Sequence, residues 1–428
     1  MRKMVKMSMA AVMVMGIGSV SAQAEGTEIL SNIKVDGQAR ARYEMVDKKN
    51  ATPNANAVTN RLKIGIGADL FGTDWLSAYA EMTDVRALND NYNSTSNGEN
   101  HQVVADPEQT RLTQAYLDIS LGDPKLRIGR QMINLDNQRF VGAVGWRQMF
   151  QTFDAYTLTY NSIENLNLFA SYVTQVNTIK ADSDLTPSED TIDTRTLLLN
   201  ASYKVMDELK VTAYGYLIGE NSDNNLDGGS DTYGIALTGN VNAIDGVKLD
   251  YRAEYAAQKD PSMEASGFST PAQDKDANYY NIELNANASG FLVGIQYEVL
   301  SGANASGTET AFQTPLATLH AHNGYGDIFL TTPDEGLEDL NFTLGYKSKE
   351  FGTLKAIYHD FSSEVGSIDY GNELDIIYTR AVPNVNNLTG TLKFVKYDAD
   401  DVTGSSNVTT NVDMTKFVAM LDYKFSTK

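Results

Sequence analysis

The chain has no cysteine and, after residue 24, no run of about 20 apolar residues. The missing cysteines exclude a disulfide scaffold, a thiol nucleophile and thiolate metal ligands. The missing apolar runs exclude membrane-spanning helices in the mature chain. Cations are scarce too, because 34 lysines and arginines face 55 aspartates and glutamates and leave a net charge of -21. That charge repels phosphate backbones, so no nucleic-acid partner is expected.

The N-terminal segment has the organisation of a secretory signal peptide. Basic residues at 2–6 precede an apolar stretch at 7–18, and small residues suited to cleavage follow at 22–24. We therefore predict a signal peptide over residues 1–24 and one mature domain over residues 25–428, since no linker and no change of composition divides the rest. No plug domain is expected ahead of the first strand.

Alternation of apolar and polar residues recurs along the whole mature chain. In Ile33–Met45, for example, Ala39 and Ala41 share one side of a strand, and Arg40 and Arg42 share the other. The count of such segments is about eighteen, an even number, as single-chain bacterial barrels have. The expected strands are residues 33–45, 61–70, 75–86, 109–121, 125–132, 153–160, 165–176, 193–203, 209–220, 231–240, 247–258, 279–288, 291–300, 338–347, 352–361, 371–380, 388–398 and 416–425.

The last of these segments, Lys416–Phe425, ends on the aromatic residues Tyr423 and Phe425. A lipid-facing barrel wall needs this pattern, because apolar side chains must meet lipid and no sheet edge can stay open in a bilayer. We expect the barrel assembly machinery of a bacterial outer membrane to recognise this strand.

The joins between the expected strands alternate between long and short. Residues 46–60, 87–108 and 133–152 form long joins, whereas 71–74 and 122–124 form short ones. A transmembrane barrel alternates long extracellular loops with short periplasmic turns, whereas a soluble β-sandwich, the alternative fold, gives no reason for this order. The sequence therefore predicts an all-β fold, a transmembrane antiparallel β-barrel in the cell outer membrane.

Two segments resemble the alginate export family of outer-membrane porins: residues 126–155, which contain Arg-Phe-Val-Gly-Ala-Val-Gly-Trp-Arg-Gln, and residues 312–333, which contain His-Ala-His-Asn-Gly-Tyr. The family usually has His-Ala-Phe-Asn-Gly-Trp in the second segment, and His322 and Tyr325 replace its aromatic residues here. The resemblance implies a monomeric barrel of eighteen strands with a lumen narrowed by infolded loops. The best-known member passes an anionic polyuronate, but the family name does not fix the solute.

Cations on the inward side of the strands are the candidates for selecting a solute. Four of these cations, Arg40, Arg42, Arg61 and Lys63, lie on the hairpin formed by the first two strands. Their like charges therefore face each other and require compensation by an acid, a counterion or an anionic solute. Inward acids, namely Asp36, Glu44, Glu81, Asp118 and Glu254, would instead neutralise the wall of a general porin, and the sequence leaves both readings open. The predicted pore-lining residues are Arg40, Arg42, Arg61, Lys63, Lys125, Arg127, Lys248 and Arg252, with Lys416 and Lys424 extending the same wall.

Two long loops carry polar and aromatic side chains suited to a sugar-like solute. Residues 133–152 are the candidate constriction loop, and residues 303–336 could fold inward or cover the pore; surface loops are the alternative for both. The pair His320 and His322 lacks a third ligand, so no metal site is expected. The candidate residues are Asp136, Asn137, Gln138, Arg139, Trp146, Arg147 and Gln148 in the first loop, and His320, His322, Asn323, Tyr325 and Asp327 in the second.

Four further cations follow the lipid-facing side of their strands near the extracellular rim: Arg86, Arg111, Arg195 and Lys259. There a cation costs about 0 to 1 kcal/mol, against about 2 to 4 kcal/mol at the midplane. We expect these residues to contact lipid headgroups and lipopolysaccharide phosphates. Pairing with acids of the loops is the alternative.

The sequence contains no catalytic constellation. Its four histidines accompany no serine in a nucleophile-elbow context, and Asp223–Gly228 lacks the glutamate that completes a calcium loop. No enzyme activity and no cofactor are expected. We predict a porin that lets small hydrophilic solutes diffuse, anionic or sugar-like ones among them. The alternative is a structural or surface-binding barrel, an adhesin or receptor, whose loops carry the function.

Overall fold

The computed structural model describes residues 29–183, 190–220, 229–263, 275–303, 310–400 and 411–427. The predicted signal peptide, residues 1–24, and the acidic segment Asp223–Gly228 lie outside the described residues. The described elements are β1 (Leu30–Lys48), β2 (Ala55–Leu70), β3 (Leu76–Ala87), β4 (Gln109–Ser120), β5 (Lys125–Gln131), β6 (Thr152–Tyr160), β7 (Leu166–Asn177), β8 (Thr191–Met206), β9 (Leu209–Glu220), β10 (Ser230–Ile244), β11 (Val247–Lys259), β12 (Asp276–Ala288), β13 (Phe291–Leu300), the short helix η1 (Leu319–Ala321), β14 (Leu337–Ser348), β15 (Gly352–Ser362), β16 (Asp369–Ala381), β17 (Leu388–Ala399) and β18 (Met414–Ser426).

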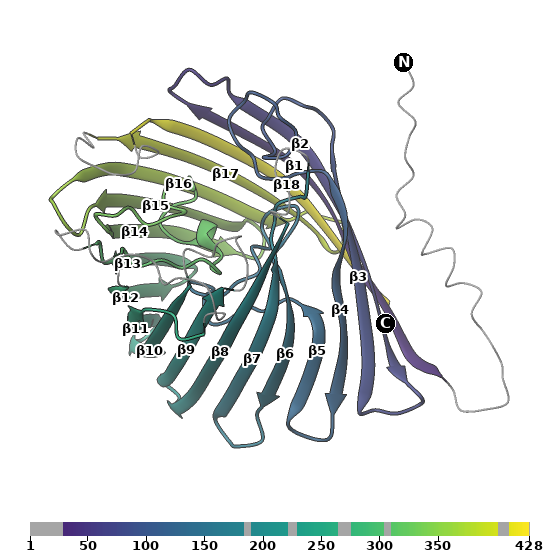
Figure 1. Ribbon diagram of the computed structural model, residues 1–428. Helices are drawn as coiled ribbons and strands as arrows, with labels where there is room; N and C mark the ends of the chain where they lie inside the picture. The colour runs from purple at the N-terminus through teal and green to yellow at the C-terminus, as the bar shows by residue number, and fades with distance from the viewer. Residues whose placement is uncertain are drawn as a thin grey trace, which may run out of the picture.

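The strands form one 18-stranded antiparallel sheet that closes on itself, as predicted. Each strand pairs with its neighbours in sequence, and β1 pairs with β18 from Asp36 opposite Ser426 to Lys48 opposite Met414. Figure 1 shows β1, β2 and β18 side by side, although they come from opposite ends of the chain. The closed sheet satisfies its own backbone hydrogen bonds, which a bilayer requires.

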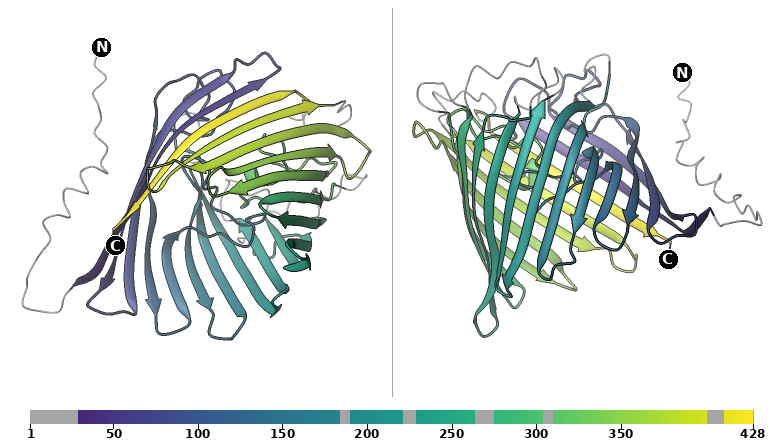
Figure 2. Two further views of the ribbon diagram at one scale, coloured as in Figure 1. Left: turned by 180° about the vertical axis from the view of Figure 1, so that it is seen from behind. Right: turned by 60° about the horizontal axis from the view of Figure 1, so that its bottom comes forward.

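The joins differ at the two ends of the barrel. One end has joins of a few residues, such as 207–208 and 245–246, and we call it the short-turn rim. The other end carries long segments such as 88–108, 132–151 and 301–336, and we call it the long-loop rim. In the right-hand view of Figure 2 the strands are tilted and run between these two rims. No helix in the described part of the chain is long and apolar enough to cross a membrane.

Strand β2 begins at Ala55, six positions ahead of the predicted start at Arg61. The added residues pair with β1 as far as Val46 opposite Ala55, above the apolar outer band. The inward residues Ala55 and Ala57 are small, apolar and fully buried, so this part of the strand lacks the polar inward side chains that mark the rest of it. The alternation of polar and apolar residues therefore does not predict the part of a strand whose inner side packs against loops.

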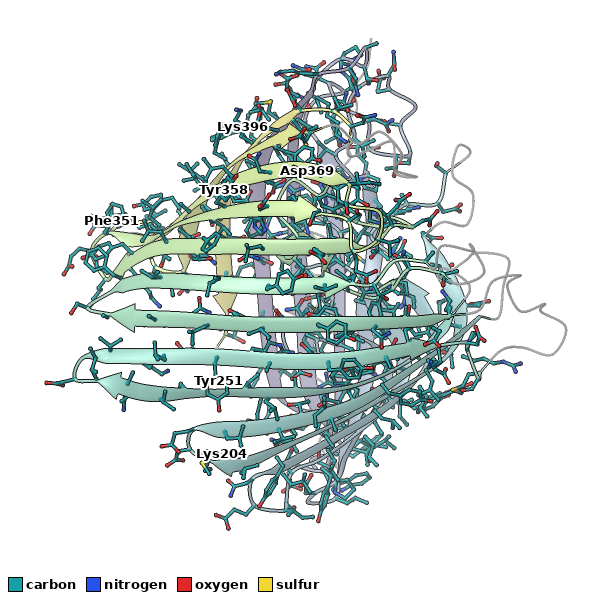
Figure 3. All side chains as sticks on the ribbon, turned by 90° about the vertical axis from the view of Figure 1, so that its left-hand side faces the viewer. Lys204, Tyr251, Phe351, Tyr358, Asp369 and Lys396 are labelled. Carbon is teal, nitrogen blue, oxygen red and sulfur yellow. The ribbon has the colours of Figure 1, made fainter. Side chains whose placement is uncertain are left out.

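Outward side chains make an apolar surface, with Ile282, Val293 and Leu344 all more than half exposed. An aromatic chain lies at the short-turn rim, where Tyr346 contacts both Phe291 and Phe351 with ring centroids 4.9 and 6.1 Å apart. In Figure 3, Phe351 lies at this rim and Tyr358 on the outer wall. Amphipathic aromatic residues suit the boundary between hydrocarbon and headgroups.

The buried apolar cluster of the described residues lies inside the barrel and not between packed layers. Phe140, from the loop after β5, contacts Tyr214, Tyr279 and Phe312 at centroid distances of 5.2, 5.3 and 6.1 Å. Phe312 belongs to the long segment after β13. Two loops therefore meet the inner wall and each other within the lumen.

The closed wall predicts a steep depth dependence for charged substitutions on its outer face. Ile282, at the centre of β12, is 65% exposed, whereas Leu121, in a turn at the short-turn rim, is 74% exposed. Ile282→Arg should lower the free energy of unfolding by about 2–4 kcal/mol in lipid vesicles, and Leu121→Arg by about 0–1 kcal/mol. Denaturant titration in vesicles measures both, and equal losses would contradict a bilayer centred on β12.

Candidate functional site

Residues 132–151, which we call the crossing loop, leave the wall after β5 and pass through the lumen. On one side the loop accepts hydrogen bonds from Arg40 of β1 and Arg61 of β2. On the far side Asp136 accepts a hydrogen bond from Asn200 of β8 at 3.0 Å, and Arg139 forms an ion pair with Glu298 of β13 at 2.8 Å. The loop therefore touches opposite walls of the barrel.

Arg40 and Arg61 are direct partners in the register of β1 and β2, so two cations face each other. The Arg40 guanidinium donates to the carbonyl oxygens of residues 145, 146 and 147 at 2.9–3.2 Å, and Arg61 donates to those of residues 147 and 148 at 3.0–3.1 Å. Asp422 also pairs with Arg40 at 2.9 Å. Backbone dipoles of the loop thus supply much of the compensation that the like-charge pair requires.

Arg139 fastens the crossing loop to a second segment, residues 310–336, which we call the second lumen loop. Besides Glu298, its guanidinium donates to Thr314 and Asn323 at 3.1 Å each. The Asn323 amide donates in turn to Glu298 at 2.6 Å. The Arg139 side chain is almost completely buried, and a buried cation is tolerated only with such complete pairing.

Trp146 of the crossing loop stacks on His320 of the second lumen loop. The two rings are 12° from parallel, with centroids 3.3 Å apart. Cations surround the indole, with Arg147 at 4.0 Å and Lys393 and Lys416 at 5.4 Å from its centroid. The negative face of the ring attracts each of them, so one tryptophan links two loops and two strands.

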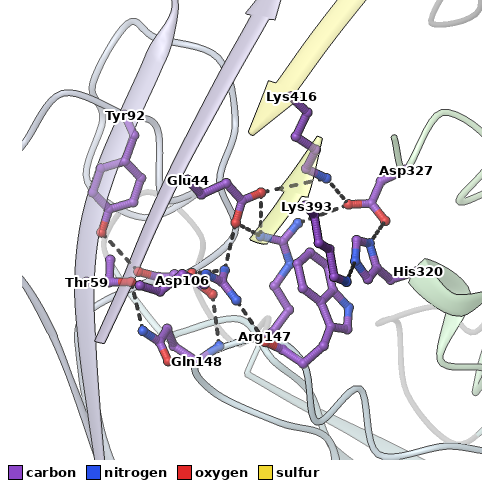
Figure 4. Close-up of polar contacts among 12 residues, drawn as sticks. Glu44, Thr59, Tyr92, Asp106, Arg147, Gln148, His320, Asp327, Lys393 and Lys416 are labelled. Carbon is purple, nitrogen blue, oxygen red and sulfur yellow. Dashed lines mark hydrogen bonds and ion pairs between the residues drawn. The ribbon is translucent and has the colours of Figure 1, made fainter. Parts of the chain in front are cut away.

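His320 joins the stack to the ionic network drawn in Figure 4. Burial lowers the pKa of His320 well below its usual range, so the ring is neutral. Its partners define the tautomer: Nδ1 donates to Asp327 at 2.7 Å, and Nε2 accepts from the Lys393 ammonium at 2.7 Å. Burial by itself raises the pKa of the Asp327 carboxyl, but His320 and Lys416 outweigh it and hold that pKa well below its usual range.

Glu44 of β1 is a second centre of the same network. Its carboxylate lies 2.9 Å from Arg42, 3.3 Å from Arg147 and 3.7 Å from Lys416. Lys416 also lies 2.5 Å from Asp327, so an unbroken chain of charges connects the wall to both loops. A network in which every charge is paired holds its members in place more strongly than separate pairs would.

A third loop, residues 88–108, takes part through Asp106. Its carboxylate pairs with Arg42 and accepts a hydrogen bond from the Gln148 backbone at 3.0 Å, while the Tyr92 hydroxyl donates to the Asp106 carbonyl. Sequence reasoning missed Asp106, because nothing in a polar loop marks it. It also missed Lys393, which the inward parity of β17 could have identified.

The other predicted lumen cations, on β2, β5 and β11, pair with acids. Lys63 pairs with Glu81 at 2.7 Å, and Asp118 pairs with both Lys125 and Arg127. The remaining two pairs are Lys248 with Asp250 and Arg252 with Glu254. Arg61 differs, because no carboxylate of the described residues lies within ion-pair distance of it.

Two of the cavities in the lumen lie on different sides of the loops. The first, which we call the basic cavity, has a volume of about 510 Å³ and is bounded by β1, β2, β18 and the crossing loop. Four cations and one carboxylate line it: Arg40, Arg61, Lys63, Lys424 and Asp36. The second has a volume of about 500 Å³ and lies against β11–β15, below Asn137, His322, Asn323 and Tyr325.

One of the four predicted rim cations, Arg111, does not lie on the outward face of its strand. Strand β4 has one extra residue opposite the step from Glu81 to Met82 of β3, which shifts the register between the two strands. Arg111 is therefore the partner of Thr83, a buried inward residue. Its guanidinium donates to the carbonyls of residues 178 and 180 at 2.8 Å each. The predicted headgroup contact of Arg111 is therefore corrected, because a bulge reverses the alternation on which it depended.

The other three rim cations keep the outward side. Arg86 pairs with Asp84 at 2.6 Å, Lys259 pairs with Asp276 on the neighbouring strand, and Arg195 is exposed opposite Gly219. Their contact with lipid headgroups stays a prediction.

The ionic network predicts that Asp327 holds the second lumen loop in place. Asp327→Asn would leave Lys416 and Arg147 dependent on Glu44, and removing one partner of a buried pair costs about 3–5 kcal/mol. Hydrogen–deuterium exchange of residues 310–336 should then be at least about tenfold faster, since about 1.4 kcal/mol already corresponds to a factor of ten. Glu99→Gln, on an exposed loop position, is the matched control. Unchanged exchange in Asp327→Asn would show that the loop is held by its other contacts, the Trp146–His320 stack and the hydrogen bonds of Arg139.

Comparison with known proteins agrees with the barrel fold described above. The profile of the alginate export family matches residues 31–304, more than half of the chain. Similar solved structures include OccAB2 of Acinetobacter baumannii, at 14% identity and a TM-score of 0.70 over 94% of this chain and 100% of that one. OpdL of Pseudomonas aeruginosa has 14% identity and a TM-score of 0.67 over 93% and 99% of the two chains.

OpdK of Pseudomonas aeruginosa, solved with vanillate, has 12% identity and a TM-score of 0.68 over 94% of this chain and 100% of that one. No curated protein matches the sequence. The structural likeness shows the barrel fold, and the profile match shows descent. The chain belongs to the alginate export family, and its fold is that of an outer-membrane porin.

Proposed function

We propose that the protein is a passive channel for small hydrophilic solutes and that the basic cavity gives it a preference for anions. The observation that carries this proposal is Arg61, a cation on the cavity wall that has no carboxylate partner among the described residues. Arg40 and Lys63 each have one acid, Asp422 and Glu81. A solute carboxylate in the cavity would be attracted by an arginine whose charge no acid of the described residues pairs with.

The chemistry of the cavity suits a carboxylate in two ways. Arginine binds carboxylates with two parallel hydrogen bonds, and a cavity lined by cations raises the local concentration of anions. Phe150 adds an apolar surface beside Lys63, whose ammonium lies 4.7 Å from the ring centroid. The similar protein OpdK was solved with vanillate, an aromatic carboxylate, which agrees with this solute class.

The crossing loop and the second lumen loop form the constriction in this proposal. They are joined through Trp146, His320 and Arg139, so they restrict the lumen as one unit. A solute must pass beside that unit, and the charged cavity wall is where it would be selected. This arrangement favours a size-limited channel over a wide general pore.

We further propose that the protein is a monomer without catalytic activity, and that Arg86, Arg195 and Lys259 meet lipopolysaccharide phosphates at the long-loop rim. The outward position of these cations supports the rim contact. Recognition of β18 by the barrel assembly machinery is supported by its aromatic end, Tyr423 and Phe425. A surface-binding barrel without transport is the alternative, and silence in planar bilayers would favour it.

Neutralising the basic cavity should change ion selectivity. In the triple variant Arg40→Gln, Arg61→Gln, Lys63→Gln, the reversal potential in a salt gradient should shift toward cation selectivity, and less so at high ionic strength, because salt screens lumen charges. Arg130→Gln is the control, since Arg130 pairs with Asp154 and does not line the cavity. An unchanged reversal potential in the triple variant would remove the basic cavity from the selectivity mechanism.

Shortening the crossing loop should widen the channel. Replacing residues 136–149 by a short glycine-serine linker should raise single-channel conductance, while heat-resistant gel migration reports that the barrel stays folded. Deleting residues 95–99, which are the tip of another long loop, is the control and should leave conductance unchanged. Equal conductance of wild type and the loop-shortened variant would mean that the crossing loop does not limit flow.

A further inference from the structure

The second cavity has a wall made of a regular grid of inward side chains. One row across the strands contains Asp250, Asn285, Gly294 and Thr343, each the register partner of the next. The adjacent row contains Glu283, Gln296 and Asn341. Because the register is continuous over β11–β14, these groups face the lumen at fixed spacing.

Two glycines in this grid leave room for the side chains beside them. Gly294 and Gly345 face the lumen where their strand neighbours carry Asn285 and Leu292. A Cβ at Gly294 would collide with the Asn285 amide oxygen, and a Cβ at Gly345 would lie 3.2 Å from the Leu354 carbonyl oxygen and 3.3 Å from the Lys355 side chain. Glycine weakens a strand interior, so its presence here accords with a need for space.

Carboxamides are the most numerous kind of polar side chain in the lining of this cavity. The amides of Asn285 and Asn287 donate to Glu283 at 2.6 Å and to Asp250 at 2.7 Å. Those contacts orient both amides, and each keeps an oxygen and an N–H that no other described residue uses. A carboxamide that offers one donor and one acceptor matches a hydroxyl group, which needs both.

The charge of the cavity disfavours an anion. Its lining holds two carboxylates, Asp250 and Glu283, and one lysine, Lys355, whereas four cations and one carboxylate line the basic cavity. His359 is already held between Asp339 and Asp375 at 2.9 and 3.6 Å. A free carboxylate would therefore be repelled by two acids of the lining, whereas an uncharged solute could hydrogen-bond to the amides.

We propose that this second cavity, the amide cavity, is a binding site for a neutral, hydroxyl-rich solute of disaccharide size. Its volume of about 500 Å³ falls within the range of small-molecule sites, and Tyr325 adds an aromatic surface at its roof. The role of the site in permeation rests on the proposed channel function, whereas binding itself does not. The lumen then has an anion route on one side of the loops and a sugar site on the other.

Calorimetric titration of the detergent-solubilised barrel with sucrose tests binding without any need for conduction. Wild type should bind sucrose, and Gly294→Leu, whose side chain would displace the Asn285 amide, should weaken binding at least about tenfold. Asn285→Leu should do the same by removing an amide from the wall. Gly390→Leu is the matched control, because Gly390 lies on the outer face of β17 with its nearest neighbour atom 3.6 Å from the Cβ position.

Planar-bilayer recordings with added sucrose separate this inference from the proposed function. A barrel that conducts ions, shows no sucrose-dependent block and binds no sucrose would overturn the amide cavity and leave the channel standing. A barrel that binds sucrose but never conducts would overturn the channel and leave the site standing. Equal binding by wild type, Gly294→Leu and Asn285→Leu, with all three folded by circular dichroism, would place the sugar elsewhere and refute the assignment.

Discussion

Two arginines that face each other across the first hairpin impose the condition on which the lumen of this barrel depends. Arg40 and Arg61 cannot share one register position without compensation, and an acid satisfies only the first of them. The crossing loop supplies the rest through main-chain oxygens of residues 145–148. Once that segment is held against β1 and β2, Trp146 lies where it meets His320, and the second lumen loop is drawn into the same network.

This arrangement explains why the interior is neither empty nor packed like a globular core. Charged and amide groups line most of the wall, so water can fill the remaining space. Aromatic packing occurs where loop residues meet the wall, as in the contacts of Phe140 with Tyr214 and Tyr279 and of Phe329 with Phe361. The loops lie between two cavities of unlike character, one rich in cations and one rich in amides. Ion pairs and stacking therefore position the loops, while the space beside them stays polar.

The wall was predictable from the sequence because lipid on one side and water on the other enforce strict alternation. Each of the eighteen predicted segments overlaps one strand, although β2 begins earlier than predicted, and the inward cations of β1 and β2 follow from the same rule. The rule gave the wrong side for Arg111, because one inserted residue in β4 reverses the side that the residues before it face. Local pattern carries no information about such a bulge.

The loops were predictable in composition but not in contacts. Trp146, Arg147, His320 and Asp327 were recognisable as candidate residues, yet their pairing joins positions more than 170 apart in the chain. Nothing in the sequence shows that Arg61 would be satisfied by carbonyl groups or that Asp106 would reach Arg42. Such contacts depend on where a loop is held in space, which periodicity cannot reveal.

The use of carbonyl oxygens to hold the crossing loop has a consequence for how this lumen can change in evolution. Every residue type presents the same main-chain oxygen, so the attachment at residues 145–148 does not depend on which side chains stand there. Substitutions in the loop can thus alter what a solute meets without releasing the loop from the wall. A barrel built in this way can acquire new solutes through loop mutations alone, while Arg40 and Arg61 keep the scaffold in place.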